Sequence, residues 1–450
     1  MPTSFFQDLL GNIADRGRSI VDLRREARPR GPDDLLALSD ALVSNRGEAS
    51  GTALASEIVL GYGALRGEGR RDYLRGLTAR LATDPRAIDA AIDDYRNEPN
   101  AANARRLHQA AEPRRQELLR RLNMAPRGTE ALVRMREDLL SLLKDEPELA
   151  DLDEDFRHLF ASWFNRGFLV LRRIDWQTPA AILEKIIRYE AVHEITDWDD
   201  LRRRIDPPDR RLYAFFHPAL TDEPLIFVEI ALACGIPAAI APLLSSDRDP
   251  VDPNEADTAV FYSISNCQVG LQGISFGNFL IKQVAEDLAR ELPEVATFVT
   301  LSPVPGFRQW LACEGLGLLG PEERGRVTEL EERGWPDDEA LASELRTLLM
   351  PLAAHYFLKA KNDRGRPPDP VARFHLGNGA RLERINWLGD RGPKALRQAA
   401  GLMVNYRYVL KDVERNHESY AKDKAIVATP AVRRLLRAER TQKALVTVNE

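Results

Sequence analysis

Cysteine is scarce in this sequence, which holds three cysteines among 450 residues. Cys234, Cys267 and Cys313 are odd in number and none belongs to a Cys-x-x-Cys pair, so the sequence predicts neither a disulfide framework nor a cysteine zinc site. The first residues also contain no continuous apolar stretch of the kind found in secretory signals. We therefore expect a reducing compartment and place the protein in the cytoplasm.

Long apolar runs and an excess of one charge are missing as well. No segment approaches the roughly 18 consecutive apolar residues that a membrane-spanning helix needs, so we expect no membrane partner. The formal net charge is only -6, from 63 basic and 69 acidic residues, which argues against a nucleic-acid partner. No two histidines have the spacing of metal ligands, so no metal site is expected.

The length favours two domains, because a single compact core rarely extends beyond about 250 to 300 residues. In residues 1–165 apolar side chains recur every three or four positions, as at Leu132, Met135 and Leu139, which predicts amphipathic helices. Turn-forming residues break this part of the chain at 45–47, 98–100 and 125–128. Residues 1–165 are therefore predicted to form an all-α helical bundle.

Residues 166–450 have a different residue pattern, since runs of β-branched and aromatic residues appear there. Predicted strands span 168–172, 212–217, 225–232, 259–265 and 297–302. An amphipathic pattern from Phe279 to about Leu292, with Asn278 as its N-cap, predicts a helix between the last two strands. The expected fold class is α+β, with a helical bundle followed by a mixed α/β domain.

A glycine-bearing loop stands between the strand 259–265 and this helix. Gly270, Gly273 and Gly277 precede the helix directly, in a position where glycines let the backbone approach a phosphate closely. The loop has neither the Gly-Lys-Ser/Thr of a P-loop nor the GxGxxG spacing of a dinucleotide site. A phosphate-binding loop and a plain tight turn therefore both remain open for this segment.

Ser302 and His375 are the residues best suited to carry chemistry. Ser302 ends the last predicted strand, and the Pro303-Val-Pro-Gly306 sequence after it fixes the chain direction. His375 stands between apolar residues, and a partly buried imidazole can deliver a proton near neutral pH. Each also has a structural interpretation, since the serine could cap a turn and the histidine could be a hydrogen-bonded core residue.

Six short blocks resemble malonyl-CoA decarboxylases in residue identity and in order. They are residues 261–265, 270–273, 301–307, 374–376, 384–387 and 401–408. The resemblance covers roughly residues 160–425, and it is more specific than any single motif because the blocks occur in one order with suitable gaps.

This resemblance implies that residues 166–450 form a catalytic domain of the GNAT acetyltransferase fold. Residues 1–165 would then be the oligomerisation domain of a homo-oligomer, commonly a tetramer. Ser302 and His375 are implied as the catalytic pair, with Tyr408 and Asn405 as supporting residues in a matching block. The implied CoA-binding loop consists of Gln272, Gly273, Ile274, Ser275, Phe276, Gly277 and Asn278. Some relatives have a glutamate where this chain has Ser275, so no role for a loop carboxylate carries over.

The implied reaction is the decarboxylation of malonyl-CoA to acetyl-CoA and CO2. Loss of CO2 leaves a thioester enolate that the thioester carbonyl stabilises, so no cofactor is expected besides the CoA of the substrate. Ser302 is expected to hydrogen-bond the malonyl carboxylate and His375 to orient the serine, and one of the two protonates the α-carbon. Two alternatives stay open: a GNAT-type acyl-CoA-dependent acyltransferase and a non-catalytic acyl-CoA sensor.

Overall fold

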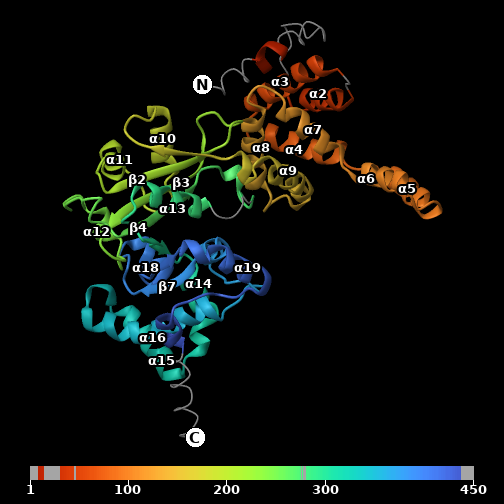
Figure 1. Ribbon diagram of the computed structural model, residues 1–450. Coiled ribbons are helices and arrows are strands. Elements are labelled where there is room, and N and C mark those ends of the chain that lie inside the picture. The colour runs from red at the N-terminus through yellow and green to blue at the C-terminus, as the bar shows by residue number, and fades with distance from the viewer. Residues whose placement is uncertain (1–8, 15–30, 45–46, 275, 277–279, 437–450) are drawn as a thin grey trace. The chain divides into compact units, whose positions relative to one another are not determined.

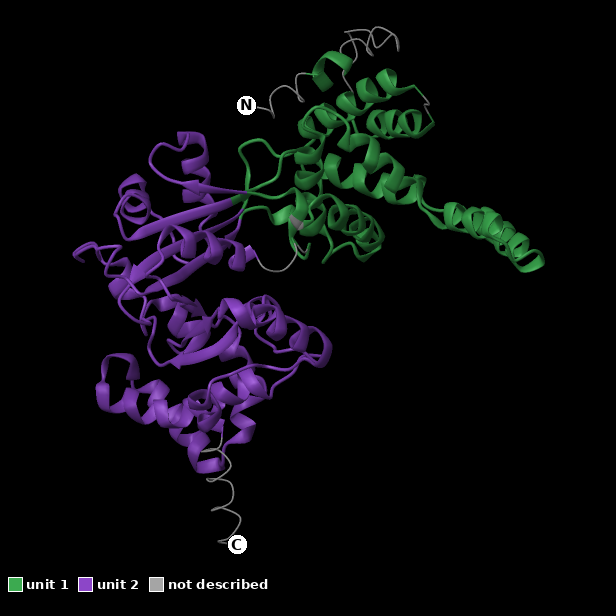
Figure 2. Cartoon of the chain, viewed as in Figure 1, with its two compact units in different colours: residues 1–170, 215–225, 267–276 green, residues 171–214, 226–266, 277–450 purple. Residues whose placement is uncertain are grey.

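The computed structural model describes residues 9–14, 31–44, 47–274, 276 and 280–436. The chain forms two compact units, which Figure 2 shows in different colours. The first comprises residues 1–170, 215–225 and 267–276, and the second comprises residues 171–214, 226–266 and 277–450. The predicted fold class, a helical amino-terminal region followed by a domain built on a mixed sheet, is confirmed. The division at residue 165, with its assigned roles, stays a prediction.

The first unit is a bundle of α-helices (Figure 1). Its helices and 3-10 turns are α2 (Pro32–Ser44), α3 (Glu48–Ala64), α4 (Glu68–Arg80), α5 (Pro85–Asn97), α6 (Ala101–Ala111), α7 (Arg114–Asn123), α8 (Gly128–Leu142), η1 (Pro147–Leu149), α9 (Ala150–Trp163) and η2 (Arg166–Phe168). The side chains of Asp84 and Asn100 accept backbone N–H groups at the starts of α5 and α6. The predicted breaks at 98–100 and 125–128 are confirmed, whereas residues 45 and 46 of the first break lie outside the described residues.

The predicted apolar stripe of α8 faces the core of this unit. Leu132 and Leu139 are fully buried, and Met135 is 1% exposed. Arg115 and Asp155 form an ion pair in the same interior, with 2.7 Å between Nε and Oδ2. The bundle therefore buries a paired charge as well as apolar side chains.

The second unit is built on an eight-stranded mixed sheet (Figure 1). The strands are β1 (Val170–Ile174), β2 (Arg210–Phe216), β3 (Pro224–Ala233), β4 (Thr258–Asn266), β5 (Thr297–Thr300), β6 (Ser302–Pro303), β7 (Arg381–Asn386) and β8 (Met403–Arg407). They lie in the order β1-β2-β3-β4-β5-β8-β6, and β7 pairs with β8. β4 is antiparallel to β3 and parallel to β5, and the parallel register ends at the pair Phe261 and Thr300.

The predicted strands are confirmed with two shifts. The first begins at Val170, since Phe168 belongs to the 3-10 turn η2. The last is divided after Thr300, because the pairing with β4 ends there while the pairing with β8 continues. Leu301 still donates its N–H to the carbonyl of Phe261, but Ser302 pairs with Val404 of β8. The pairing with Val404 fixes the direction of Ser302.

Helices connect and cover the strands of the second unit. They are α10 (Ala180–Tyr189), α11 (Trp198–Ile205), α12 (Ala241–Leu244), α13 (Leu280–Glu291), α14 (Phe307–Cys313), α15 (Pro321–Glu332), α16 (Glu339–Leu358), α17 (Pro370–Gly377), α18 (Pro393–Ala399) and α19 (Val413–Asp423). The 3-10 turns η4 (Gly315–Leu318), η5 (Trp335–Asp337) and η6 (Leu410–Asp412) also belong to this unit. The turn η3 (Val269–Leu271) belongs to the first unit. The predicted helix after the glycine loop is α13, while its predicted N-cap Asn278 lies outside the described residues. Within the described part of the chain, none of the helices has the length and apolar character to span a membrane.

Candidate active site

Ser302 is held at the point where β5 gives way to β6. Its side chain is 5% exposed, and its hydroxyl donates to Oγ1 of Thr300 at 2.9 Å. The same Oγ1 accepts the backbone N–H of Tyr406 in β8 at 3.1 Å. Because residues two apart on a strand share a face, Thr300 and Ser302 present both hydroxyls on one side of the sheet.

His375 reaches this serine from α17. Nε2 lies 3.1 Å from Oγ of Ser302, and Nδ1 lies 2.9 Å from the hydroxyl of Tyr408. The imidazole is stacked on the ring of Tyr406, with centroids 4.7 Å apart and an angle of 24° between the planes. The structure thus brings together Ser302, His375 and Tyr408, three of the residues predicted for the site.

Burial sets the charge of these groups. Desolvation lowers the pKa of His375 to about 3, so the ring is neutral at physiological pH. Burial also raises the pKa of Tyr408 above its ordinary range, so its phenol keeps its proton. The Ser302 proton is engaged by Thr300, which leaves Nε2–H as the donor to Oγ of Ser302 and Nδ1 as the acceptor of the Tyr408 hydroxyl.

Asn405 supports the site through the backbone. It is fully buried in β8, and its amide donates to the carbonyls of Thr300 at 2.8 Å and Pro237 at 3.2 Å. Its oxygen accepts from Asn386 at 2.8 Å and from Arg384 at 3.1 Å. These bonds hold the end of β5, which carries Thr300, so the support given by Asn405 to the serine is indirect.

Asp369 was missed by the sequence analysis. It is the N-cap of α17 and accepts the N–H of Ala372 at 2.8 Å, and its Oδ2 would lie 3.9 Å from an added Cβ at Gly306 in the loop that follows Ser302. Desolvation raises its pKa to about 6. One buried carboxyl group therefore caps the helix of His375 and lies beside the loop of Ser302. The signal was present in the sequence, since an aspartate followed by Pro370 is typical of a helix start.

The glycine loop has a more specific structure than the sequence indicated. An added Cβ at Gly270 would lie 1.9 Å from the carbonyl oxygen of Val133 in α8, so this glycine is explained by close packing against a helix rather than by a ligand. Gly273 has φ +77°, is exposed, and has nothing within 4 Å of an added Cβ. The N–H groups of Gln272 and Ile274 are bonded inside the loop, to the carbonyls of Val269 and Leu271.

The structure describes only part of the rest of the implied CoA-binding loop. Phe276 is buried, whereas Ser275, Gly277 and Asn278 lie outside the described residues. The contact assignments for the whole loop, residues 272–278, stay predictions.

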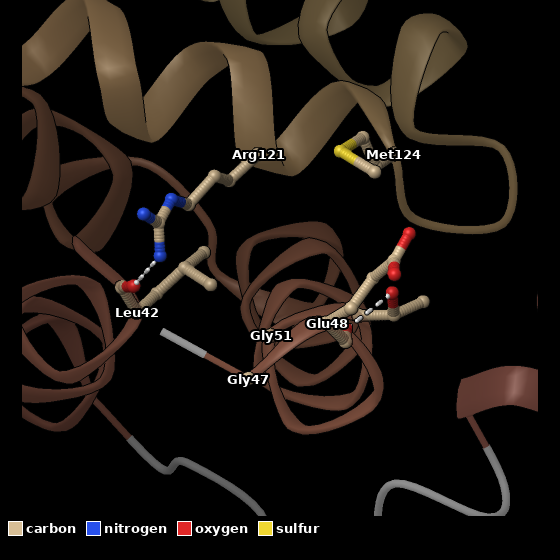
Figure 3. Close-up of a pocket in the computed structure, with 7 residues that line it drawn as sticks. Leu42, Gly47, Glu48, Gly51, Arg121 and Met124 are labelled. Carbon is tan, nitrogen blue, oxygen red and sulfur yellow. Dashed lines mark hydrogen bonds between the residues drawn. The ribbon is translucent and has the colours of Figure 1, made fainter. Parts of the chain in front are cut away.

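The helical unit contains a small pocket of about 220 Å³ (Figure 3). Arg121 enters it and donates to the carbonyl of Leu42 at 2.6 Å, and Glu48 and Met124 line its other sides. These groups do not form a nucleophile with a base. Over the described residues, no cluster of three or more His, Cys, Asp or Glu side chains could hold a metal ion.

Family models match both parts of the chain. Residues 167–446 match the family model described as malonyl-CoA decarboxylase C-terminal domain, and residues 81–164 match malonyl-CoA decarboxylase N-terminal domain. A mitochondrial malonyl-CoA decarboxylase of Anser anser anser is 36% identical over 416 residues, which cover 84% of this chain and 82% of that protein.

Solved structures are similar to this chain in sequence and in fold. A crystal structure of malonyl-CoA decarboxylase from Rhodopseudomonas palustris is 57% identical and has a TM-score of 0.88, covering 90% of this chain and 100% of the other. One from Cupriavidus metallidurans is 36% identical with a TM-score of 0.71, covering 91% and 100%. The chain belongs to the malonyl-CoA decarboxylase family.

Proposed function

We infer that the protein converts malonyl-CoA to acetyl-CoA and CO2. Membership of the family supports the reaction, and the observation that carries the assignment to this site is the hydrogen bond between Oγ of Ser302 and Nε2 of His375. The pair is buried and lies beside two tyrosines, so charge that develops there is exposed to little water.

We propose that the Ser302 hydroxyl, which donates to Thr300 in the free protein, rotates to donate to the malonyl carboxylate and turns that group out of the thioester plane. The bond between the carboxyl carbon and the α-carbon then overlaps the carbonyl system. When this bond breaks, CO2 leaves and the electron pair passes into the thioester as an enolate. The thioester carbonyl is the electron sink, so the proposed reaction requires no metal or organic cofactor.

The enolate must then take up one proton. His375 is neutral in the free protein, but a bound malonyl carboxylate would favour the imidazolium, so the ring would take a proton from solvent as substrate binds. The proton on Nε2 passes to Oγ of Ser302 as the serine proton passes to the α-carbon, and the ring becomes neutral with its remaining proton on Nδ1. Tyr408 stays hydrogen-bonded to the ring: its hydroxyl donates to Nδ1 in the free protein and accepts from Nδ1–H once the ring is protonated. Proton exchange with solvent restores the first tautomer when the products leave.

Three further properties belong to this proposal. The glycine loop binds the diphosphate of CoA, for which the exposed and conformationally unusual Gly273 is a supporting observation. The protein is a homo-oligomer of four chains, as the family resemblance implies, and light scattering tests this against the chain mass of 50.6 kDa. It resides in the cytoplasm, in keeping with its low cysteine content.

The reaction is tested by mixing metal-stripped protein with malonyl-CoA and following acetyl-CoA and CO2 by mass spectrometry. We expect both products in equal amounts. An acetylated amine or thiol acceptor formed without CO2 would instead identify an acyltransferase. Tight binding of malonyl-CoA with no product over hours would identify a sensor, and either result would overturn the decarboxylase assignment.

A further inference from the structure

A buried arginine of the helical unit holds the glycine loop. Arg136 of α8 is 1% exposed, and its Nη1 donates to the carbonyl of Gly270 at 2.7 Å and to that of Gln272 at 2.9 Å. Its Nε donates to Oδ1 of Asp153 at 2.8 Å, which fixes the guanidinium from the other side. All four residues belong to the same compact unit.

The contact of Arg136 with the carbonyl of Gln272 also fixes the direction of the next N–H group, that of Gly273. The carbonyl of Gln272 and the N–H of Gly273 belong to one peptide group, and in a planar trans peptide the two point in opposite directions. With the oxygen held by Arg136, the N–H of Gly273 points away from α8. A cation at the carbonyl oxygen also polarises the peptide and makes its N–H a stronger donor.

Gly273 is accessible to a ligand. It is exposed, and no atom of the described residues would lie within 4 Å of an added Cβ there. The neighbouring N–H groups of Gln272 and Ile274 are already bonded inside the loop. A donor directed outward from a fixed turn is suited to a phosphate oxygen.

We propose that Arg136 is a positioning residue for the diphosphate of CoA. It acts through the Gln272–Gly273 peptide and does not touch the ligand itself. In this role the helical unit contributes to substrate binding and not only to assembly. The inference rests on the proposed function, because it takes the loop to be the CoA-binding loop.

The test compares full-length wild type with Arg136→Met, Arg136→Lys and the control Arg115→Met. Arg115 is 6% exposed and pairs with Asp155 in the same bundle, so its loss removes a comparable buried ion pair without reaching the loop. Steady-state kinetics are measured with malonyl-CoA and with malonyl-pantetheine, which lacks the nucleotide and its diphosphate. Calorimetric titration with free CoA gives the affinity directly.

We expect Arg136→Met to raise KM for malonyl-CoA and Kd for CoA roughly 10-fold while kcat stays within about two-fold, as for loss of one hydrogen bond to a charged group. Catalytic efficiency with malonyl-pantetheine should equal that of wild type. Arg136→Lys, whose ammonium can donate to the same carbonyls, should recover part of the loss. Arg115→Met should leave KM unchanged even if it lowers the melting temperature.

Equal losses with both substrates, an unchanged Kd for CoA, or the same rise in KM for Arg115→Met would each overturn the proposal. So would Arg136→Lys with no recovery, since the effect would then come from Asp153 alone. Failure of wild type to decarboxylate malonyl-CoA is a different result, because it overturns the proposed function before any variant is compared.

Discussion

The hydroxyl of Tyr408 determines which nitrogen of His375 carries the proton. It donates to Nδ1 at 2.9 Å, and its removal would leave that nitrogen buried without its partner. We expect Tyr408→Phe to lower kcat roughly 10-fold with KM unchanged, because an unsatisfied buried acceptor costs about 1–3 kcal/mol. Steady-state kinetics with malonyl-CoA measure both constants.

Tyr420 offers a matched control for this substitution. It is also buried, and its hydroxyl makes no hydrogen bond to any residue in the described part of the chain. Tyr420→Phe should therefore retain the wild-type kcat. Equal activity of the two variants would show that the phenol of Tyr408 does not orient the imidazole.

The neutral state of His375 can be observed directly. Because burial lowers its pKa to about 3, the folded protein leaves the ring unprotonated between pH 4 and 8, whereas the unfolded chain protonates it near pH 6.5. Between about pH 3 and 6.5 the unfolded state then binds more protons, so the contribution of His375 to stability is complete above pH 6.5 and is lost as pH falls towards 3.

NMR of the ring nitrogens in protein with ¹⁵N-labelled histidine measures this protonation. We expect the signals of His375, assigned by their absence in His375→Gln, to remain those of a neutral ring down to about pH 4.5. A midpoint between pH 6 and 7 in the free protein would contradict the account.

At the scale of elements, the N-cap of α17 connects stability to activity. We expect Asp369→Ala to lower stability by about 1–2 kcal/mol and kcat by roughly 10- to 100-fold, because α17 loses its N-cap and the Ser302 loop loses a neighbouring carboxyl group. KM should change little. Thermal melting and steady-state kinetics on the same preparations give the two effects separately.

Two variants separate the effect of losing a helix N-cap on stability from the effect of losing the Asp369 carboxyl group on kcat. Asp338 caps α16 through the N–H groups of Ala340 and Leu341, so Asp338→Ala should lose stability and keep its kcat. Asp369→Asn keeps an acceptor at the same place and should remain close to wild type. A full kcat in Asp369→Ala would show that the carboxyl group has no positioning role.

The sequence predicted those parts of the elements that depend on local pattern. Runs of β-branched and aromatic residues were enough to place the strand that carries Thr300, and three- and four-residue spacing was enough for α8 and α13. The division of the last strand was not predictable, since it depends on where the pairing with β4 ends while the pairing with β8, about a hundred residues later, continues. The reason for a glycine at position 270 was likewise not predictable, because it is the close approach of the carbonyl oxygen of Val133, which is far from Gly270 in the sequence.

At the scale of the whole molecule, the family resemblance identified Ser302 and His375 as partners, although 73 residues separate them in sequence. Local sequence could not have done so, because a turn-capping serine and a core histidine would look the same. The role of Thr300 becomes visible only when β5 and β8 are placed together. Asp369 has the sequence signal of a helix start, but that signal does not show that its carboxyl group lies beside the Ser302 loop.

The central claim is that this pair performs the decarboxylation. It is tested most directly by the turnover of malonyl-CoA by Ser302→Ala, measured beside its calorimetric affinity for CoA. The account predicts that kcat falls about 100- to 1000-fold, as for loss of an essential hydrogen-bond donor at a reacting group, while Kd for CoA stays within about two-fold of wild type. Full turnover by Ser302→Ala with unchanged CoA affinity would contradict it.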